Sequence, residues 1–110
     1  PQSRAQAEAE VRSWGFSHVF TWTDGRTSLS LATRQRPLTD HEGRGAYYPP
    51  HTHSGKTTHL ILSGGLTFTY PDDANSKWES LGVGGRWDVD ANKRHEVRVG
   101  NEGCTYVIGE

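Results

Sequence analysis

The stretch GAYYPPHTHSGKTTHLILSGG, residues 45–65, decides the fold and the chemistry that we expect of this chain. Three histidines lie close together in it: His51, His53 and His59. Because side chains alternate along a strand with period two, the imidazoles of His51 and His53 should share one face. Read alone, the same pair would also suit an exposed polar loop. His59 would equally suit a buried histidine that is hydrogen-bonded to a neighbouring strand.

A second stretch, GGRWDVDANKRH at residues 84–95, ends in a fourth candidate, His95. Neutral imidazole is the commonest protein ligand of Zn, Fe, Ni and Cu. A metal site on a barrel wall needs two such ligands from one strand and one or two from its neighbours. We therefore expect His51, His53 and His95 to bind one divalent metal ion per chain (Fe, Zn, Ni or Mn), with His59 as a further ligand.

The rest of the chain predicts a helix at residues 3–13, where helix formers dominate, and then short strands. The expected strands are 18–23, 57–62, 66–70, 87–90, 95–99 and 105–108, with a turn at 63–65. Short strands at this spacing indicate a sandwich or a barrel. Residues 26–45 are polar and poorly patterned, apart from a short strand expected at 27–33. We expect this segment to be a flexible loop or a lid.

Composition agrees with a small β protein. The chain has 110 residues, which suits a single domain over 1–110. Its hydrophobic fraction is 32% and it has 13 glycines, which disfavours a helical bundle and suits tight turns. The single cysteine, Cys104, is expected to fill the core, since one cysteine cannot form an internal disulfide.

Charge and hydropathy exclude two classes of partner. The net charge of −1 does not mark a protein that binds nucleic acid or an acidic membrane. No apolar run reaches the length of a membrane span or of a signal sequence. We therefore expect a cytoplasmic protein whose partner is a small molecule.

The two histidine stretches resemble the two motifs of the cupin superfamily. The first cupin motif runs G, five residues, H-x-H, three or four residues, E, six residues, G. Gly45, His51 and His53 match its spacing, and the glycine pair at 64–65 matches its end. The resemblance implies an all-β, single-domain cupin jelly-roll β-barrel with a short N-terminal helix. It also implies a homodimer.

The second cupin motif runs G, five residues, P-x-G, two residues, H. Gly84 and His95 reproduce this spacing, with Asp90 in place of the proline and Asn92 in place of the second glycine. Residues 45–99 thus carry both motifs in the right order. They cover about half of the chain.

One departure bears on the chemistry. The usual glutamate of the first motif is missing, and Thr57 or Thr58 stands in its place. On the expected strand, Thr57 and His59 share a face, so His59 would either replace the carboxylate ligand or line the barrel cavity. Three histidines without the carboxylate make the site more positive, which favours an anionic or chelating substrate. Such a site resembles those cupin dioxygenases that hold ferrous iron through three histidines.

The resemblance implies a divalent-metal-dependent enzyme, oxygenase-like, that acts on a small organic molecule. A metal-dependent isomerase or lyase is the nearest variant, with the metal as a Lewis acid. Two non-catalytic alternatives stay open. In one, the barrel binds a small ligand without turnover. In the other, the metal stabilises a small barrel with a weak core.

Four residues near the motifs are candidates for contact with the substrate: Tyr47, Thr57, Trp87 and Tyr106. Aromatic side chains serve core packing at least as well. Three arginines close to the motifs are candidates for anion recognition, although such residues are often solvated rim charges. They are Arg86, Arg94 and Arg98.

Overall fold

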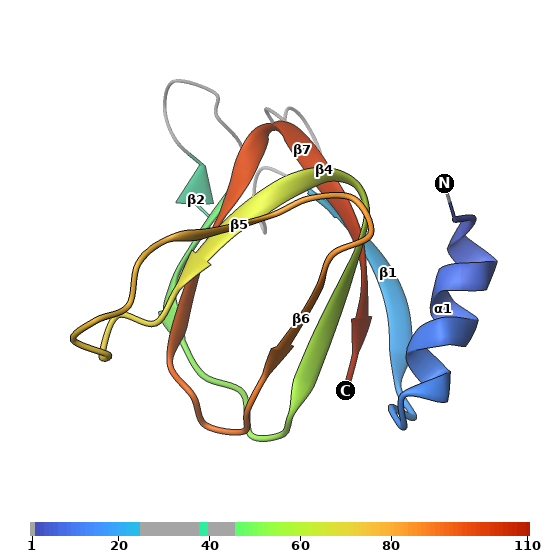
Figure 1. The fold of residues 1–110 in the computed structure, drawn as a ribbon, viewed down its shortest axis with the longest axis horizontal. Coiled ribbons are helices and arrows are strands. Elements are labelled where there is room, and N and C mark those ends of the chain that lie inside the picture. The colour runs from blue at the N-terminus through green and yellow to red at the C-terminus, as the bar shows by residue number, and fades with distance from the viewer. Residues whose placement is uncertain (1, 25–37, 40–45) are drawn as a thin grey trace.

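The computed structural model describes residues 2–24, 38–39 and 46–110, which form one helix and seven strands (Figure 1). In chain order these are α1 (Arg4–Ser13), β1 (Val19–Asp24), β2 (Leu38–Thr39), β3 (Ala46–His51), β4 (Thr57–Thr69), β5 (Glu79–Leu81), β6 (Arg86–Val89) and β7 (His95–Gly109). All strand pairs are antiparallel, and the sheet curls around its own interior. The expected all-β barrel with a short N-terminal helix is confirmed.

Strands β4 and β7 are long, and they bend where the sequence predicted breaks. The expected turn at 63–65 is wrong, since β4 runs on through it, and β7 likewise joins the two strands expected at 95–99 and 105–108. Gly64 has φ of +73°, and a Cβ there would lie 2.0 Å from the carbonyl oxygen of Gly103. The glycine therefore lets the two strands cross closely and bend together, which is a common use of glycine within sheets.

The two long strands organise the whole sheet. Along its first half β7 pairs with β3, along its second half with β1, and on its other edge with β4. Strand β4 in turn pairs with β6 near its start and with β5 near its end. This register sets His51 directly opposite His95. Two segments that are far apart in the sequence thus meet at one end of the barrel.

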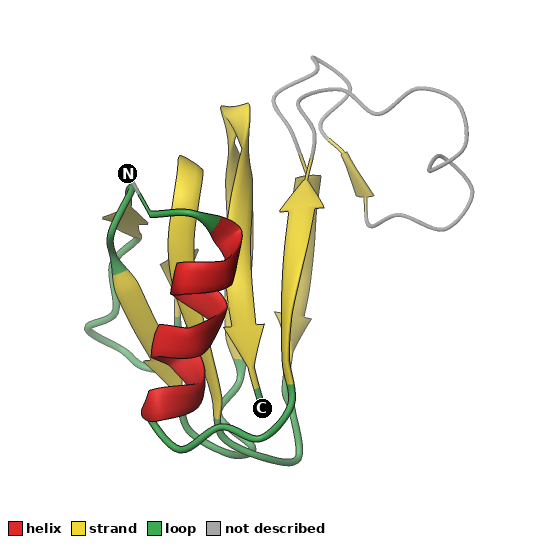
Figure 2. Ribbon diagram, turned by 90° about the vertical axis from the view of Figure 1, so that its right-hand side faces the viewer, coloured by secondary structure: helices red, strands yellow, loops and turns green. Residues whose placement is uncertain are grey.

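The helix α1 covers the outer face of the sheet (Figure 2). A capping box between Ser3 and Gln6 begins it, as is typical of a stable first turn. Its fully buried Ala7 and Val11 pack in a cluster with Leu60 of β4 and Val107 of β7. A second, larger apolar cluster lies on the other face, inside the barrel.

Three further expectations concern the remaining segments. The expected loop or lid at 26–45 and the strand at 27–33 lie outside the described residues, except that β2 pairs with β3. Cys104 is buried in the core as expected, and burial raises the pKa of its thiol to about 12. The only helix in the described part of the chain is too short and too polar to span a bilayer.

Candidate metal centre and adjoining cavity

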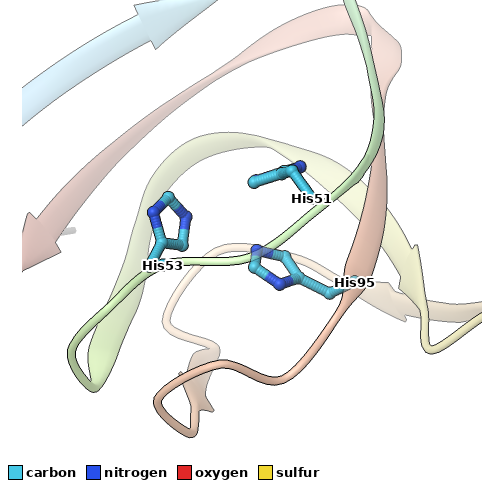
Figure 3. A group of neighbouring side chains, drawn as sticks. All are labelled: His51, His53 and His95. Carbon is cyan, nitrogen blue, oxygen red and sulfur yellow. The ribbon is translucent and has the colours of Figure 1, made fainter.

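His51, His53 and His95 come together at one end of the barrel (Figure 3). His51 ends β3 and His95 begins β7, and their ring centroids lie 4.2 Å apart. His53 follows two residues beyond β3, and its ring centroid lies 5.0 Å from that of His51 and 5.2 Å from that of His95. One nitrogen from each ring lies within 4.8 Å of the others. This spacing suits three ligands of one ion.

Backbone carbonyl groups orient two of the rings. Nδ1 of His51 lies 2.8 Å from the carbonyl oxygen of Pro49, and Nδ1 of His95 lies 2.9 Å from that of Lys93. A carbonyl oxygen can only accept, so Nδ1 carries the proton in both rings. Nε2 then keeps its lone pair for a metal. Metal-binding histidines commonly donate their other ring N–H to such a partner.

The turn before β7 is hydrogen-bonded to the backbone of His53. Asn92 stands where the cupin motif has a glycine, and its φ of +63° is in the left-handed region that glycine or asparagine adopts most readily. From that conformation its backbone N–H donates to the carbonyl oxygen of His53 at 2.7 Å. The two motif segments are therefore linked by a hydrogen bond next to the cluster.

Burial favours the neutral form of two of the three rings. His95 is almost completely buried, whereas His51 and His53 are half-buried. Burial lowers the pKa of His53 and of His95, and the proximity of His51 lowers both further. Neutral imidazole is the form that binds a metal.

The residues of the cluster suit a transition-metal ion better than Mg or Ca. Three imidazoles with no carboxylate in the described group suit Fe, Zn or Ni, whereas Mg and Ca prefer oxygen ligands. Three protein ligands also leave coordination positions open, as is typical of catalytic sites. His51, His53 and His95 can thus hold a metal and still leave room for another molecule.

His59, the fourth predicted ligand, lies outside this group of three. Its ring is 9% exposed and stacks on the indole of Trp87, with centroids 4.7 Å apart. Its Nδ1 lies 3.1 Å from the backbone oxygen of Trp87, and burial lowers its pKa to about 4. This is the geometry of a neutral histidine built into the wall, the alternative that the sequence left open.

A cavity of about 280 Å³ adjoins the cluster at His53. This is close to the lower end of the usual range of ligand sites, roughly 300–1,000 Å³. Its wall is largely aromatic and apolar, and it contains Phe20, Trp22, Tyr48, Leu66, Trp87, Val97, Tyr106 and Ile108. The polar residues of the wall are His53, Thr57, His59 and Glu110.

Three of the four predicted substrate contacts, Thr57, Trp87 and Tyr106, line this cavity. The fourth, Tyr47, does not, and its hydroxyl donates to Glu96 instead. Neighbouring residues of a strand face opposite ways, so Tyr48 lines the cavity in its place. The prediction from the sequence named Tyr47 alone, and the register of β3 decides which of the two tyrosines faces inward.

Sequence reasoning missed one functional group, the buried carboxylate of Asp24. It accepts from the hydroxyl groups of Tyr48 (2.8 and 2.9 Å) and Tyr106 (2.9 Å) and from the indole N–H of Trp22 (3.0 Å). Burial, followed by the charge of Asp24, raises the pKa of both tyrosines, so both stay protonated. In the sequence, Asp24 precedes Gly25 and signalled only a turn.

The three candidate arginines do not belong to the cavity wall. Arg86 pairs with Asp88 and lies over the ring of Trp14, and Arg94 pairs with Asp72. The guanidinium of Arg98 lies 5.0 Å from the ring centroid of Tyr47. None of them lines the cavity in the described structure.

Neither a family model nor a curated protein sequence matches this chain significantly. Solved structures do match its fold. One is the WlaRB TDP-quinovose 3,4-ketoisomerase from Campylobacter jejuni, at 13% identity and a TM-score of 0.55, over 86% of this chain and 61% of that one. Another is the polyketide cyclase RemF from Streptomyces resistomycificus, at 23% identity and a TM-score of 0.51, over 59% of this chain and 44% of that one.

A third match is CENP-C from Drosophila melanogaster, solved bound to CAL1, at 10% identity and a TM-score of 0.51, over 59% of this chain and 53% of that one. The chain thus spans less than two thirds of each of these structures. Identities this low support a shared fold and leave function to the site itself. RemF and WlaRB are cupin-fold proteins, and this chain has the cupin fold.

Proposed function

We propose that this protein is a metal-dependent enzyme that acts on a small organic molecule. His51, His53 and His95 would hold one divalent ion, and the adjoining cavity would hold the substrate. The observation that carries the proposal is the hydrogen bonding of the cluster. Nδ1 of His51 and of His95 is committed to backbone carbonyl groups, so the Nε2 lone pairs are available for an ion. When bound, the ion would supply a Lewis-acid or redox centre with open positions.

The cavity adjoins the residues that would hold this ion. His53 belongs to both the cluster and the cavity wall, so a molecule in the cavity would lie next to the ion. Trp87 is held between Phe68 (ring centroids 4.0 Å apart) and His59, which gives the wall a rigid aromatic surface. Such a surface excludes water and orients a substrate.

An oxygenase-like reaction suits the wall better than an isomerase or lyase reaction. The latter two need a general base in the cavity, ideally with a pKa near the working pH. The pKa of His59, about 4, makes it a weak base, and Asp24 already accepts from three donors. Glu110 is the one carboxylate in the described wall, so an isomerase or lyase reaction would depend on it as the base.

Elemental analysis of protein purified without chelators or nickel columns tests the proposal. We expect about one Fe, Zn or Ni per chain, and with iron, dioxygen uptake on addition of phenols, indoles or diketones. The double variant His51→Ala/His53→Ala should bind no metal stoichiometrically, whereas His18→Ala, which alters an exposed histidine, should bind as the parent does. Unchanged metal binding by the double variant would contradict the site.

A non-catalytic binding barrel is the second candidate, favoured by the same shortage of acid and base groups in the wall. Metal at one per chain with ligand binding but no turnover would support it. The homodimer also remains a prediction. Light scattering of the purified protein at micromolar concentration tests it directly.

A further inference from the structure

The hydrogen-bond donors at one side of the cavity are already in use. The hydroxyl groups of Tyr48 and Tyr106 both donate to Asp24, and so does the indole N–H of Trp22. The two hydroxyl oxygens can therefore offer only lone pairs to a molecule in the cavity. This side of the wall accepts hydrogen bonds and donates none.

The neighbouring part of the wall, formed by His59 and Trp87, also offers no free donor from its aromatic rings. The indole N–H of Trp87 donates to the hydroxyl oxygen of Tyr70 at 3.0 Å. Nδ1 of His59 donates to the backbone oxygen of Trp87, so the Nε2 of the neutral ring is an acceptor. Neither aromatic ring has a donor to spare for a ligand.

The charged side chains of the described wall also favour an uncharged ligand. The described wall contains no lysine or arginine, and its carboxylate is that of Glu110, with Asp24 behind the tyrosines. An anion in this apolar space would lose its hydration and meet no lysine or arginine of the described wall. Without a bound metal, the wall thus disfavours the anionic substrate that the sequence suggested.

One buried polar atom of the described wall is left without a partner. Thr57 is 3% exposed and lines the cavity, and its Oγ1 is a buried atom with no hydrogen bond in the structure. A buried hydroxyl group without a partner costs free energy, which a ligand can recover by bonding to it. Thr57 is therefore the natural polar anchor for a ligand.

We propose that the cavity selects an uncharged, flat, largely apolar molecule that carries a hydrogen-bond donor, of the phenol or indole class, and that its wall, without a bound metal, disfavours organic anions. The donor would bond to the Oγ1 of Thr57, and the ring would lie among the aromatic side chains of the wall. This inference deepens the proposed function, because it names the substrate class of the same site. Binding of such a molecule does not require the metal.

Titration of the metal-free, ¹⁵N-labelled protein with three matched probes tests this. Indole has the donor, 1-methylindole lacks it, and indole-2-carboxylate adds a negative charge. The indole N–H signals of Trp22 and Trp87 report on the cavity, and that of the exposed Trp78 is an internal control. We expect indole to shift the two cavity signals and to bind about 3–10-fold more tightly than 1-methylindole. The carboxylate should bind at least about tenfold more weakly than indole.

The variant Thr57→Val sharpens the test. Because Oγ1 has no partner, its removal should leave stability unchanged or raise it, so folding is not at risk. Indole affinity should fall to that of 1-methylindole. The matched control Thr105→Val alters a residue of β7 outside the cavity wall and should leave the affinity unchanged.

Two outcomes would overturn the inference: binding of the carboxylate as tight as that of indole, or full indole affinity in Thr57→Val. Failure of the proposed function looks different. A chain that binds indole as expected but no metal would contradict the metal enzyme and leave the ligand class standing. A chain that binds metal but not indole would contradict the ligand class and leave the metal enzyme standing.

Discussion

The barrel has two polar regions, and they are built in opposite ways. The histidine cluster comes from a motif of three residues, His51 to His53, and from His95 directly across the sheet. The Asp24 network comes from three segments that lie far apart in the sequence, at residues 24, 48 and 106. The first is readable from spacing, and the second exists only after the sheet has closed.

Their hydrogen bonding differs as well. In the cluster, backbone carbonyl groups hold Nδ1 of His51 and of His95 and leave the other ring nitrogen for an ion. In the network, every donor is aimed at one carboxylate, so its needs are met within the protein. The cluster is organised to bind something, and the network is organised to hold the wall together. Four substitutions or conditions test this division.

The largest effect is expected for His95→Ala. Changes to the partners of metal ligands alone cost about 10–100-fold in affinity, so loss of a ligand should cost more than about a hundredfold. Titration with Zn²⁺ or Co²⁺ by calorimetry measures it, with His18→Ala as the control. If metal binding survives in His95→Ala and disappears only when His59 is also replaced, then His59 is a ligand after all.

Asp24→Asn should lower the free energy of unfolding and leave metal binding unchanged. Hydrogen bonds to a charged group contribute about 1.5–3 kcal/mol each, and the amide accepts through one oxygen only, so we expect a loss of about 2–4 kcal/mol. Urea denaturation measures the free energy of unfolding. The exposed Asp90→Asn is the matched control and should change it by no more than about 0.5 kcal/mol. Equal losses in both variants would show that the network has no special part in stability.

Acid should weaken the fold through His59. Its pKa is about 4 in the folded chain and 6.5 as the ordinary value, so below pH 6.5 the unfolded chain binds the extra proton. Stability is therefore lost as pH falls from about 6.5 toward 4, by about 2 kcal/mol between pH 7 and pH 5. His53 and His95 shift in the same direction. Denaturation with a chelator present should show a smaller pH effect in His59→Phe, and an equal effect would exclude His59 as the cause.

The smallest effect is expected at the turn that joins the two motif segments. Asn92→Ala replaces an asparagine, which tolerates the left-handed conformation, with an alanine, which lacks the polar side chain that makes this conformation acceptable. We expect the free energy of unfolding to fall by about 1–2 kcal/mol. Asn92→Gly should be close to neutral, because glycine adopts this conformation freely. Thermal unfolding compares the two variants. If alanine is tolerated as well as glycine, the turn does not constrain the cluster.

Much of the fold was predictable because its signals are local. The helix predicted at 3–13 follows from its helix formers, and the strands follow from β-branched and aromatic runs. The bend of β4 was not predictable. The glycine pair at 64–65 reads as a reversal, and only the close approach of Gly103 shows that the chain continues in the same strand. A glycine signals freedom of the backbone and does not say how that freedom is used.

The residues of the candidate site also fall into those that the sequence predicted and those that only the structure identified. His51, His53 and His95 were predicted together from motif spacing, and the structure groups them although His53 lies beyond the end of β3. Sequence left His59 open between ligand and wall, because its role depends on a stacking contact with Trp87 from another strand. The sequence predicted Tyr47 as a cavity residue, whereas the register of β3 places Tyr48 in the cavity wall.

The sequence by itself determined the cupin-like spacing of the histidines, the β-rich class and the helix, since the two motifs, the strands and the helix each depend on residues near one another in the chain. The tertiary structure alone decided the size of the cavity, the Asp24 network and the absence of a cationic side chain from the described wall. The physical reason is that burial and hydrogen-bond partners come from strands distant in sequence. These long-range contacts determine which groups a ligand can meet.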